Sequence, residues 1–367
     1  MRIDRVTLTH VRIPFVEPFR VSNGTVTEKD GILVSVDADG LTGVGEASPM
    51  AGSLCSPETP EETWDDLVQR LIPAVISMHP RTLDDVCGLL EAVGGNPFAR
   101  AGIETAFWDM EAQRKGIPLA KLLGGSRTRV DSGLAVGITG TIPGLLATIE
   151  RFLADGYKRV KINVQHGWDI EPLTAIRERF GDISLMVDAN CAYTCADCDH
   201  LRTFDAFGLM MIEQPLPRAD LEGHARLQSM IDTPVCLDES AEDPATVQHA
   251  IDIGACRIVN ITIQRVGGLR NAVRIHDLCA AAGVPVWAGT MPALGIGSAQ
   301  TVHLATLPNF RFPTDVQSSH RWFVDDLIAP LLEAREGEIE LPQAAGNAYQ
   351  VAHNVVEKYT VRKEVVR

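Results

Sequence analysis

The sequence predicts an α/β fold, a modified TIM-like (β/α) barrel of parallel strands that follows an N-terminal α+β capping domain. From about residue 130, short apolar runs rich in β-branched residues alternate with helical stretches at a nearly constant interval. The first 125 residues do not show this period. At 367 residues the chain also exceeds the length at which one hydrophobic core usually keeps growing, so we expect two structural units.

Eight apolar runs form the predicted barrel strands. They occupy residues 132–137, 159–164, 184–187, 209–212, 235–237, 257–263, 284–288 and 311–314. Eight strands with intervening helices are the number that closes a parallel barrel, whose active site lies at the C-terminal ends of the strands. Polar residues that directly follow these runs are therefore the candidates for chemistry.

The N-terminal part predicts an antiparallel meander followed by helices. Strands are expected at 6–13, 32–37 and 42–46, with a hairpin turn at Asp39-Gly40, and helices at 60–78 and 82–90. Residues after about 320 have no further barrel strand to form and are expected to return to the cap. The expected division is thus 1–125 for the cap, 126–320 for the barrel and 321–367 for the returning segment.

Composition restricts the class of partner. Charged residues make up 22% and hydrophobic residues 45% of the chain, as in ordinary globular enzymes. A formal net charge of −15 argues against nucleic acid or an anionic membrane as a partner, because either would require a basic patch. No apolar run is long enough to span a bilayer. A cytoplasmic protein that acts on a small molecule is the default expectation.

Three acidic residues end consecutive predicted strands. Asp188, Glu213 and Asp238 are spaced 25 residues apart, which places them at equivalent ends of strands three, four and five. Carboxylates held so close repel one another unless a cation is bound, and hard oxygen ligands suit Mg²⁺. Acids that only cap the following helices are the alternative. Three equivalent positions in a row favour a metal site.

Further motifs surround these acids. They read Gly156-Tyr157-Lys158-Arg159-Val160-Lys161, Gly167-Trp168-Asp169, Val187-Asp188-Ala189-Asn190, Ile212-Glu213-Gln214-Pro215-Leu216, Leu237-Asp238-Glu239-Ser240 and Arg265-Val266-Gly267-Gly268-Leu269. With them, nearly the whole chain resembles the enolase superfamily, and best its muconate-lactonizing branch, which includes o-succinylbenzoate synthases and N-acylamino acid racemases. The resemblance implies Mg²⁺ (or Mn²⁺), a small carboxylate substrate, a homo-oligomer, and lyase or isomerase chemistry in which a proton α to the carboxylate is removed.

The two lysines that usually move protons in this family are missing. By strand alternation, Asn163 and Thr262 occupy their positions, where they could orient a substrate or a water molecule but cannot act as strong bases. Only Lys158 and Lys161 occur between residues 126 and 320, and alternation directs Lys161 into the barrel. Lys161 is therefore either the acid/base group or an electrostatic clamp for the substrate. A racemase mechanism with two lysines is not supported.

Other residues are candidates for supporting roles. His166, in the loop after strand two, could exchange protons near neutral pH, or be an ordinary solvated histidine. The resemblance assigns Asn190 to hydrogen bonds with the metal ligands, and Asp315, after strand eight, to the substrate site. It also implies that segments 17–24 and 48–57 close over the barrel mouth. Arg20 would then face a second anionic group of the substrate, unless it is a plain surface arginine.

Two alternatives remain open. Cys191, Cys195 and Cys198 have the spacing of an iron–sulfur motif, but thiols packed on one side of a helix explain them more simply. The loop after strand seven carries Ala293 where the family usually has an acid. The predicted function is a metal-dependent lyase or isomerase, and the alternative is a catalytically vestigial homologue that only binds a metal or ligand.

Overall fold

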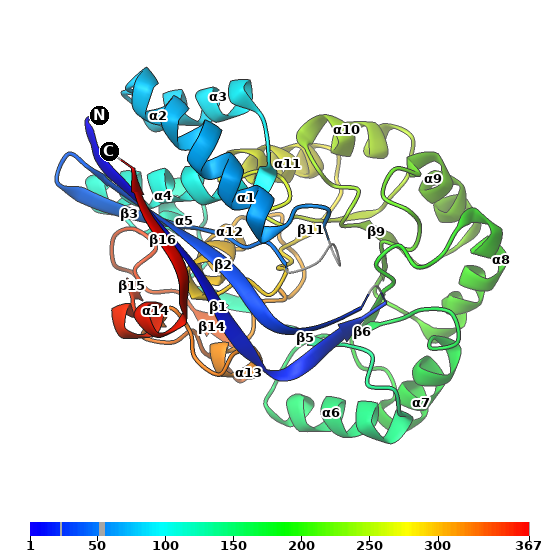
Figure 1. Cartoon of the computed structure of the whole chain (residues 1–367). Coiled ribbons are helices and arrows are strands. Elements are labelled where there is room, and N and C mark those ends of the chain that lie inside the picture. The colour runs from blue at the N-terminus through cyan, green and yellow to red at the C-terminus, as the bar shows by residue number, and fades with distance from the viewer. Residues whose placement is uncertain (23, 51–55, 367) are drawn as a thin grey trace.

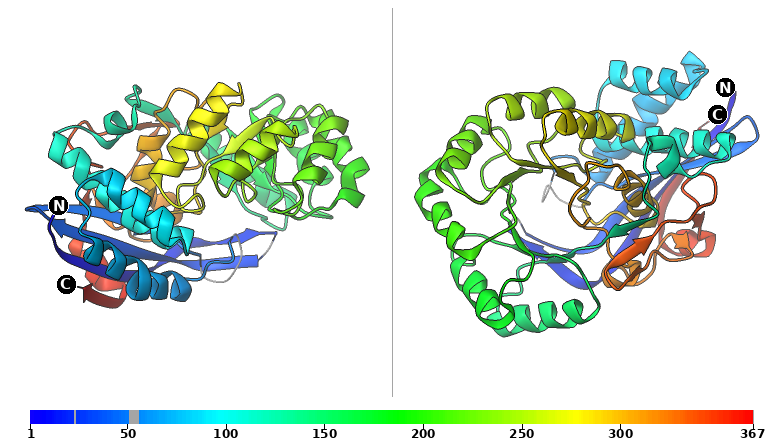
Figure 2. Two further views of the ribbon diagram at one scale, coloured as in Figure 1. Left: turned by 90° about the horizontal axis from the view of Figure 1, so that it is seen from above. Right: turned by 180° about the vertical axis from the view of Figure 1, so that it is seen from behind.

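The computed structural model describes residues 1–22, 24–50 and 56–366. A barrel with helices on its outside packs end-on against a separate layer that holds the cap (Figure 1; Figure 2). Part of the segment expected to close the barrel mouth, residues 51–55, lies outside the described residues. The predicted fold class, a TIM-like barrel with an N-terminal α+β cap, is confirmed.

The cap is a four-stranded antiparallel sheet covered by helices. Its strand order is β16 (Thr360–Val366), β1 (Ile3–Val21), β2 (Gly24–Ala38) and β3 (Leu41–Ala47). The expected turn joins β2 to β3, with positive φ at both Asp39 and Gly40. The covering helices are α1 (Pro60–Asp66), α2 (Ile72–Met78), α3 (Leu83–Val93) and α4 (Pro97–Lys115), with a π-helical turn between α1 and α2 at Leu67–Leu71.

Local sequence signals explain where these helices start and how closely they pack. Thr59 and Thr82 form capping boxes at the starts of α1 and α3. Helix α4 lies directly on β3, because Gly45 has no side chain. A Cβ atom at Gly45 would lie 2.1 Å from the carbonyl oxygen of Gly102. The glycine is therefore needed for the close packing of helix on sheet.

Seven parallel strands form the barrel wall in sequence order. They are β5 (Leu134–Val136), β6 (Val160–Asn163), β7 (Leu185–Asp188), β8 (Ile212–Glu213), β9 (Val235–Leu237), β10 (Ile258–Asn260) and β11 (Val286–Trp287). The eighth predicted run, 311–314, is not a regular strand. It closes the ring through isolated parallel bridges, Phe310 to Val286 and Thr314 to Ser132. Pro313 within this run has no N–H to donate, which limits regular pairing.

The barrel helices lie outside this ring. They are α6 (Ile142–Ala154), α7 (Ile170–Phe180), α8 (Cys198–Leu201), α9 (Leu221–Met230), α10 (Pro244–Asp252), α11 (Leu269–Ala281) and α12 (Gly295–Leu304). Helix α5 (Leu119–Leu123) and strand β4 (Arg129–Asp131) link the cap to the barrel. Among the described residues, no helix is both long and apolar enough to cross a bilayer.

The C-terminal segment folds into short elements and then rejoins the cap. These are α13 (Ser319–Trp322), β12 (Ile328–Ala329), β13 (Ala334–Arg335), β14 (Glu338–Glu340), β15 (Gln350–Val351) and α14 (His353–Tyr359), followed by β16. Strand β14 pairs with β4, and β16 pairs with β1, so the two chain ends lie close together (Figure 2).

One buried carboxylate and one contact of the β1–β2 hairpin join the cap to the barrel. Glu46 at the end of β3 is fully buried and accepts hydrogen bonds from the backbone N–H groups of Leu294 and Gly297, both at 2.8 Å, at the start of α12. At the tip of the β1–β2 hairpin, the Ser22 hydroxyl donates to the carbonyl oxygen of Ala189 at 3.3 Å. Ala189 follows β7, so the hairpin reaches the C-terminal ends of the barrel strands (Figure 1). The cap is thereby held over the end of the barrel where polar residues gather.

Candidate active site

Three carboxylates end neighbouring strands at the barrel mouth. Asp188 ends β7 and lies directly opposite Glu213, which ends β8. Glu213 in turn lies opposite Cys236, so Asp238, which directly follows β9, sits two residues further along the chain. The even spacing in the sequence predicts equal register for the three acids, and for Asp238 that prediction is wrong. The side chains still share one region: Asp188 and Asp238 line the same pocket, and Glu213 lies near enough that their charges add to burial in raising its pKa.

Lys161 lies at the centre of these acids. Its Nζ is 3.2 Å from Asp188 Oδ2, 3.2 Å from Glu213 Oε2 and 2.7 Å from Asp315 Oδ2. Burial alone would lower the pKa of Lys161, but the three negative charges outweigh burial and hold this pKa well above its usual value. The charges of the chain itself therefore keep Lys161 cationic.

A second buried cation lies one layer deeper in the barrel. Arg159, two residues before Lys161 on the same inward face, is 1% exposed and forms an ion pair with Asp315. Its guanidinium carbon is 4.9 Å from the ring centroid of Trp287, and Lys161 Nζ is 5.1 Å from the same ring. Burial raises the pKa of Asp315, but Lys161 and Arg159 outweigh burial and lower this pKa overall. Asp315 is thus a fixed anion that positions the Lys161 amine.

Asparagines hold the rim of this site. The Asn163 amide donates to Asn190 Oδ1 at 2.7 Å, and the Asn190 amide donates to Glu239 Oε1 at 3.2 Å. The backbone N–H of Asn190 donates to Asp188 Oδ1 at 3.0 Å. Asn190 therefore supports the Asp188 carboxylate through its backbone. It also fixes the orientation of the Asn163 amide.

Strand β10 supplies the opposite wall. Asn260 donates to Glu213 Oε1 at 2.7 Å, while Thr262 lies 3.4 Å from Asp238 Oδ1. Arg265, in the loop that follows, is 8% exposed and forms an ion pair with Asp238. Thr262 contacts Asp238 and Asn163 contacts Asn190, and the two come from β10 and β6, which lie four places apart in the barrel wall. These are the positions where the resemblance places the two lysines.

The carboxylate ligands at this site are of the type that binds a divalent cation, but their side chains are not oriented toward a common metal position. Three buried carboxylates lie in one region, and burial is the largest cause that raises the pKa of both Asp188 and Glu213, although the charge of Lys161 opposes it in both. Their oxygens point to Lys161, Asn260 and Arg265. Across residues 1–22, 24–50 and 56–366, no three His, Cys, Asp or Glu side chains are grouped closely enough to coordinate one ion as they stand. Side-chain rotation is therefore part of any metal binding here.

The carboxylates open into a small pocket of about 60 Å³ under the cap. Its polar floor is formed by Lys161, Asn163, Asp188, Asn190, Asp238, Asn260, Thr262, Arg265, Thr290 and Asp315. Its apolar wall consists of Phe19, Val21, Ala135, Met291, Pro292 and Trp322. Phe19 and Trp322 pack edge to face, with ring centroids 4.9 Å apart. A bound molecule would therefore meet charges at one end and uncharged surface at the other.

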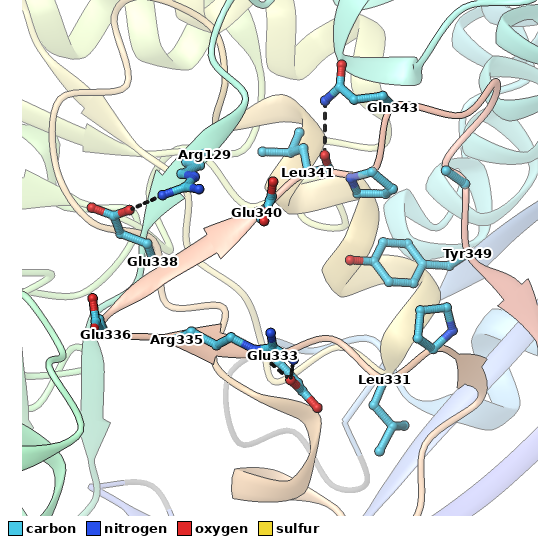
Figure 3. Close-up of a pocket in the computed structure, with 13 residues that line it drawn as sticks. Arg129, Leu331, Glu333, Arg335, Glu336, Glu338, Glu340, Leu341, Gln343 and Tyr349 are labelled. Carbon is cyan, nitrogen blue, oxygen red and sulfur yellow. Dashed lines mark hydrogen bonds and ion pairs between the residues drawn. The ribbon is translucent and has the colours of Figure 1, made fainter.

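The carboxylate pocket is not the largest cavity described in the molecule. A larger cavity of about 760 Å³ lies beside the C-terminal strands (Figure 3). Four glutamates line it, and ion pairs join Arg129 to Glu338 at 3.6 Å and Arg335 to Glu333 at 2.7 Å. It contains none of the strand-end carboxylates at the barrel mouth, and its surplus of negative charge does not suit a carboxylate ligand.

Comparison with known proteins identifies the family. Residues 3–124 match the family described as mandelate racemase/muconate lactonizing enzyme, N-terminal domain, and residues 144–355 match the enolase C-terminal domain-like family. The chain belongs to the enolase superfamily. It is an enzyme of the mandelate racemase/muconate lactonizing type, in the lyase and isomerase class. Enolase-superfamily enzymes generally use a divalent metal and act on small carboxylates.

Individual relatives of this superfamily cover almost the whole chain. The o-succinylbenzoate synthase of Geobacillus kaustophilus is 43% identical over 98% of this chain and 96% of its own length. The N-succinylamino acid racemase of an Amycolatopsis species is 40% identical over 99% of both chains. A solved superfamily member from Listeria innocua superposes with a TM-score of 0.95 at 32% identity, covering 100% of this chain and 99% of that one.

Two of the predicted site residues lie away from the pocket. His166 is in an exposed loop, where its Nε2 is 3.5 Å from Asp197 and its ring packs against Tyr193 at 4.7 Å between centroids. Arg20 has an exposed side chain, and its neighbours Phe19 and Val21 line the pocket instead.

Three residues at the enolase-superfamily site were not predicted. Alternation from Lys161 would have found Arg159, and alternation from Thr262 would have found Asn260. Arg265 follows an irregular loop, and no sequence pattern signals that it turns inward.

Proposed function

We propose that this enzyme uses Mg²⁺ or Mn²⁺, held by Asp188, Glu213 and Asp238, to remove the proton α to the carboxylate of a small substrate. The single observation that carries the proposal is the convergence of buried acids on one point: Lys161 Nζ lies 3.2 Å from both Asp188 and Glu213. The bound cation would supply positive charge for the enediolate that forms when the proton leaves.

The residues of the chain then have distinct roles. Lys161 is either the base that takes the α proton or a fixed cation that binds the substrate carboxylate. The first role requires that a bound dication draw Asp188 and Glu213 away from the Lys161 ammonium group and so lower its pKa. Asp315, backed by Arg159, positions its amine in either role. Asn163 and Thr262 lie on opposite sides of the site and offer an amide and a hydroxyl, which can orient the substrate but not accept its proton.

Elimination suits this arrangement better than racemisation. Racemisation needs a proton carrier on each side of the substrate, and Asn163 and Thr262 stand where those carriers would be. A dehydration like that of o-succinylbenzoate synthases needs only one base. The apolar wall around Phe19 and Trp322 would face the part of the substrate remote from its carboxylate. His166 and Arg20 have no contact with the pocket that would support their predicted roles in catalysis and binding.

The first experiment asks whether a base is active. The protein is incubated with Mg²⁺ in deuterated water together with N-acylamino acids, amino acids and hydroxy acids, and exchange at the α carbon is followed by NMR. Exchange with any of these supports the enzyme. If wild type exchanges none of them and Mg²⁺ still raises its melting temperature, the vestigial, metal-binding alternative is supported instead. Asp238→Asn should abolish both the exchange and the Mg²⁺-dependent stabilisation.

Lysine variants separate the two roles of Lys161. Lys161→Ala removes both charge and base, and should lower exchange by about 10²–10⁴-fold. Lys161→Arg keeps the charge but cannot accept a proton near neutral pH. Equal losses in both variants identify a base, whereas a much smaller loss in Lys161→Arg identifies an electrostatic clamp. Lys158→Ala is the matched control, because Lys158 is exposed and only approaches Glu338 at 3.7 Å. Full exchange in Lys161→Ala would refute both roles.

We further propose a cytoplasmic homo-oligomer with no nucleic-acid or membrane partner, divided into a cap (1–125), a metal-binding barrel (126–320) and a returning segment (321–367). Net charge and family resemblance support this proposal. Size-exclusion chromatography with light scattering tests the oligomeric state.

A further inference from the structure

A second pocket lies behind the wall of the carboxylate site. Its cavity of about 440 Å³ is bounded by α6, by α13 and by a bulge in β1, where the register with β2 shifts between Pro14 and Phe19. It shares no lining residue with the carboxylate pocket. Arg321 lines the second pocket, and the next residue, Trp322, lines the first. The two pockets are therefore neighbours across helix α13.

Arg321 is a largely buried cation that no carboxylate of the described residues contacts directly. Its guanidinium carbon lies 4.7 Å from the ring centroid of Phe152 and 4.9 Å from that of Trp322. Its Nε is buried and has no hydrogen-bond partner. Within the part of the chain that the structure describes, no carboxylate lies within ion-pair distance of it. Burial lowers its pKa, and the charge of the nearby Glu17 offsets only part of that effect. A desolvated, unpaired charge is costly, and a carboxylate ligand would offset that cost through paired hydrogen bonds.

The outer part of this pocket carries both signs of charge. Glu17, from the β1 bulge, and Asp155, after α6, are exposed acids, and the exposed Arg151 lies with its guanidinium carbon 4.5 Å from the Phe152 ring centroid. His320 also lines the pocket. A plain anion would be attracted by the arginines but repelled by the two acids at the rim. A molecule with both a carboxylate and an ammonium group can pair its carboxylate with the arginines and its ammonium group with the two acids.

The wall between these ends is aromatic. Phe152 and Tyr157 are both buried and pack edge to face, with ring centroids 5.8 Å apart. This surface suits an apolar side chain on the ligand, and the cavity is large enough for a small molecule of that kind.

We propose that this pocket binds a free α-amino acid, with its carboxylate on Arg321 and its ammonium group toward Glu17 and Asp155. The site has consequences for the carboxylate pocket. Glu17 lies in the bulge that ends at Phe19, and Phe19 packs on Trp322. An amino acid held between Glu17 and Arg321 therefore fixes the segment that covers the carboxylate pocket. The inference does not depend on the proposed function, because it concerns different residues.

Binding is tested on the full-length protein by calorimetry, with each common L-amino acid in turn as the probe, in EDTA and in Mg²⁺. We expect at least one to bind in both conditions. Its deaminated acid, its decarboxylated amine and inorganic phosphate should each bind at least about tenfold more weakly. Arg321→Gln should weaken amino-acid binding by a similar factor. Asp238→Asn is the matched control and should leave it unchanged, because Asp238 belongs to the other pocket.

Substitutions at the exposed acids of the pocket test the proposal even if Arg321→Gln does not fold. Glu17→Gln and Asp155→Asn alter only surface groups, and each should reduce the preference for the amino acid over its deaminated acid by about threefold or more. The proposal is overturned if no amino acid binds at concentrations up to about 10 mM, which is already weak for a specific site. It is also overturned if Asp238→Asn abolishes binding while Glu17→Gln does not, or if phosphate binds as well as the amino acid.

Discussion

Glu104 is a buried carboxyl at the junction of cap and barrel, and we predict that its ionisation lowers stability at neutral pH. It lies on α4 and is 4% exposed. Its Oε1 accepts hydrogen bonds from the backbone N–H of Arg270 at 2.7 Å and from Trp108 Nε1 at 3.0 Å. Burial raises the pKa of Glu104 from 4.5 to about 7. The folded protein therefore holds this proton more tightly than the unfolded chain does.

The sign and the size of the effect follow from these two pKa values. The stabilisation from the protonated group is fully present below pH 4.5, and it is lost as pH rises through about 7. The full difference is about 3 kcal/mol. Glu104→Gln keeps an Oε1 acceptor for both hydrogen bonds but cannot ionise. The free energy of unfolding of the variant should therefore gain about 2.5 kcal/mol relative to wild type between pH 5 and pH 8.5.

Urea unfolding followed by tryptophan fluorescence at pH 5, 6, 7 and 8.5 measures this difference. Glu150→Gln is the control, because the Glu150 side chain is 60% exposed and pairs with Arg179 at the surface. Its difference from wild type should stay nearly constant with pH. If the profile of Glu104→Gln also runs parallel to that of wild type, ionised Glu104 is not disfavoured in the fold and the reasoning is refuted.

Three further outcomes are expected. Glu46→Ala leaves two backbone N–H donors at the start of α12 unpaired, so its free energy of unfolding in urea should be about 2–5 kcal/mol lower than that of wild type. Glu46→Gln should give an intermediate value. His303 is buried, which lowers its pKa to about 4, so the unfolded chain takes up a proton there between pH 7 and pH 5 that the folded protein does not. Over this range wild type should therefore lose about 2 kcal/mol of stability relative to His303→Gln in the same unfolding assay, whatever Glu104 contributes to both proteins. A carboxylate substrate should bind in Mg²⁺ but not in EDTA by calorimetry; equal binding in both would contradict a metal-held substrate.

The barrel could be predicted because its strands are buried on both faces and read as apolar runs of regular spacing. The reach of the β1–β2 hairpin could not. Residues between Pro14 and Phe19 leave the register with β2, so their pattern no longer alternates. Contacts of Phe15 and Phe19 with Trp322, far away in the sequence, accompany this bulge. Such long-range packing is not visible in a local pattern.

The candidate site shows the same division. Strand ends located Asp188 and Glu213, and alternation located Lys161, because both depend only on the local chain. The offset of Asp238 depends on the stagger between strands, which spacing along the sequence does not encode. Arg265 has no sequence signal, and Arg159 was not predicted although alternation from Lys161 directs it inward. Arginine is almost never buried unless it is paired, and their partners come from other strands.

The buried arginines explain how so many acids coexist at one barrel mouth. Asp188, Glu213, Asp238 and Asp315 are four carboxylates, and Lys161, Arg159 and Arg265 are the three cations that contact them. The neighbouring Glu239 has a pKa raised to about 8, chiefly by burial, so it adds little charge near neutral pH. With all four carboxylates ionised, as metal binding requires, the group carries one more negative than positive charge, which repels a substrate carboxylate. A divalent cation reverses that surplus, and one bound carboxylate then restores neutrality. Metal and substrate are therefore mutually dependent occupants of the site, whichever role Lys161 has.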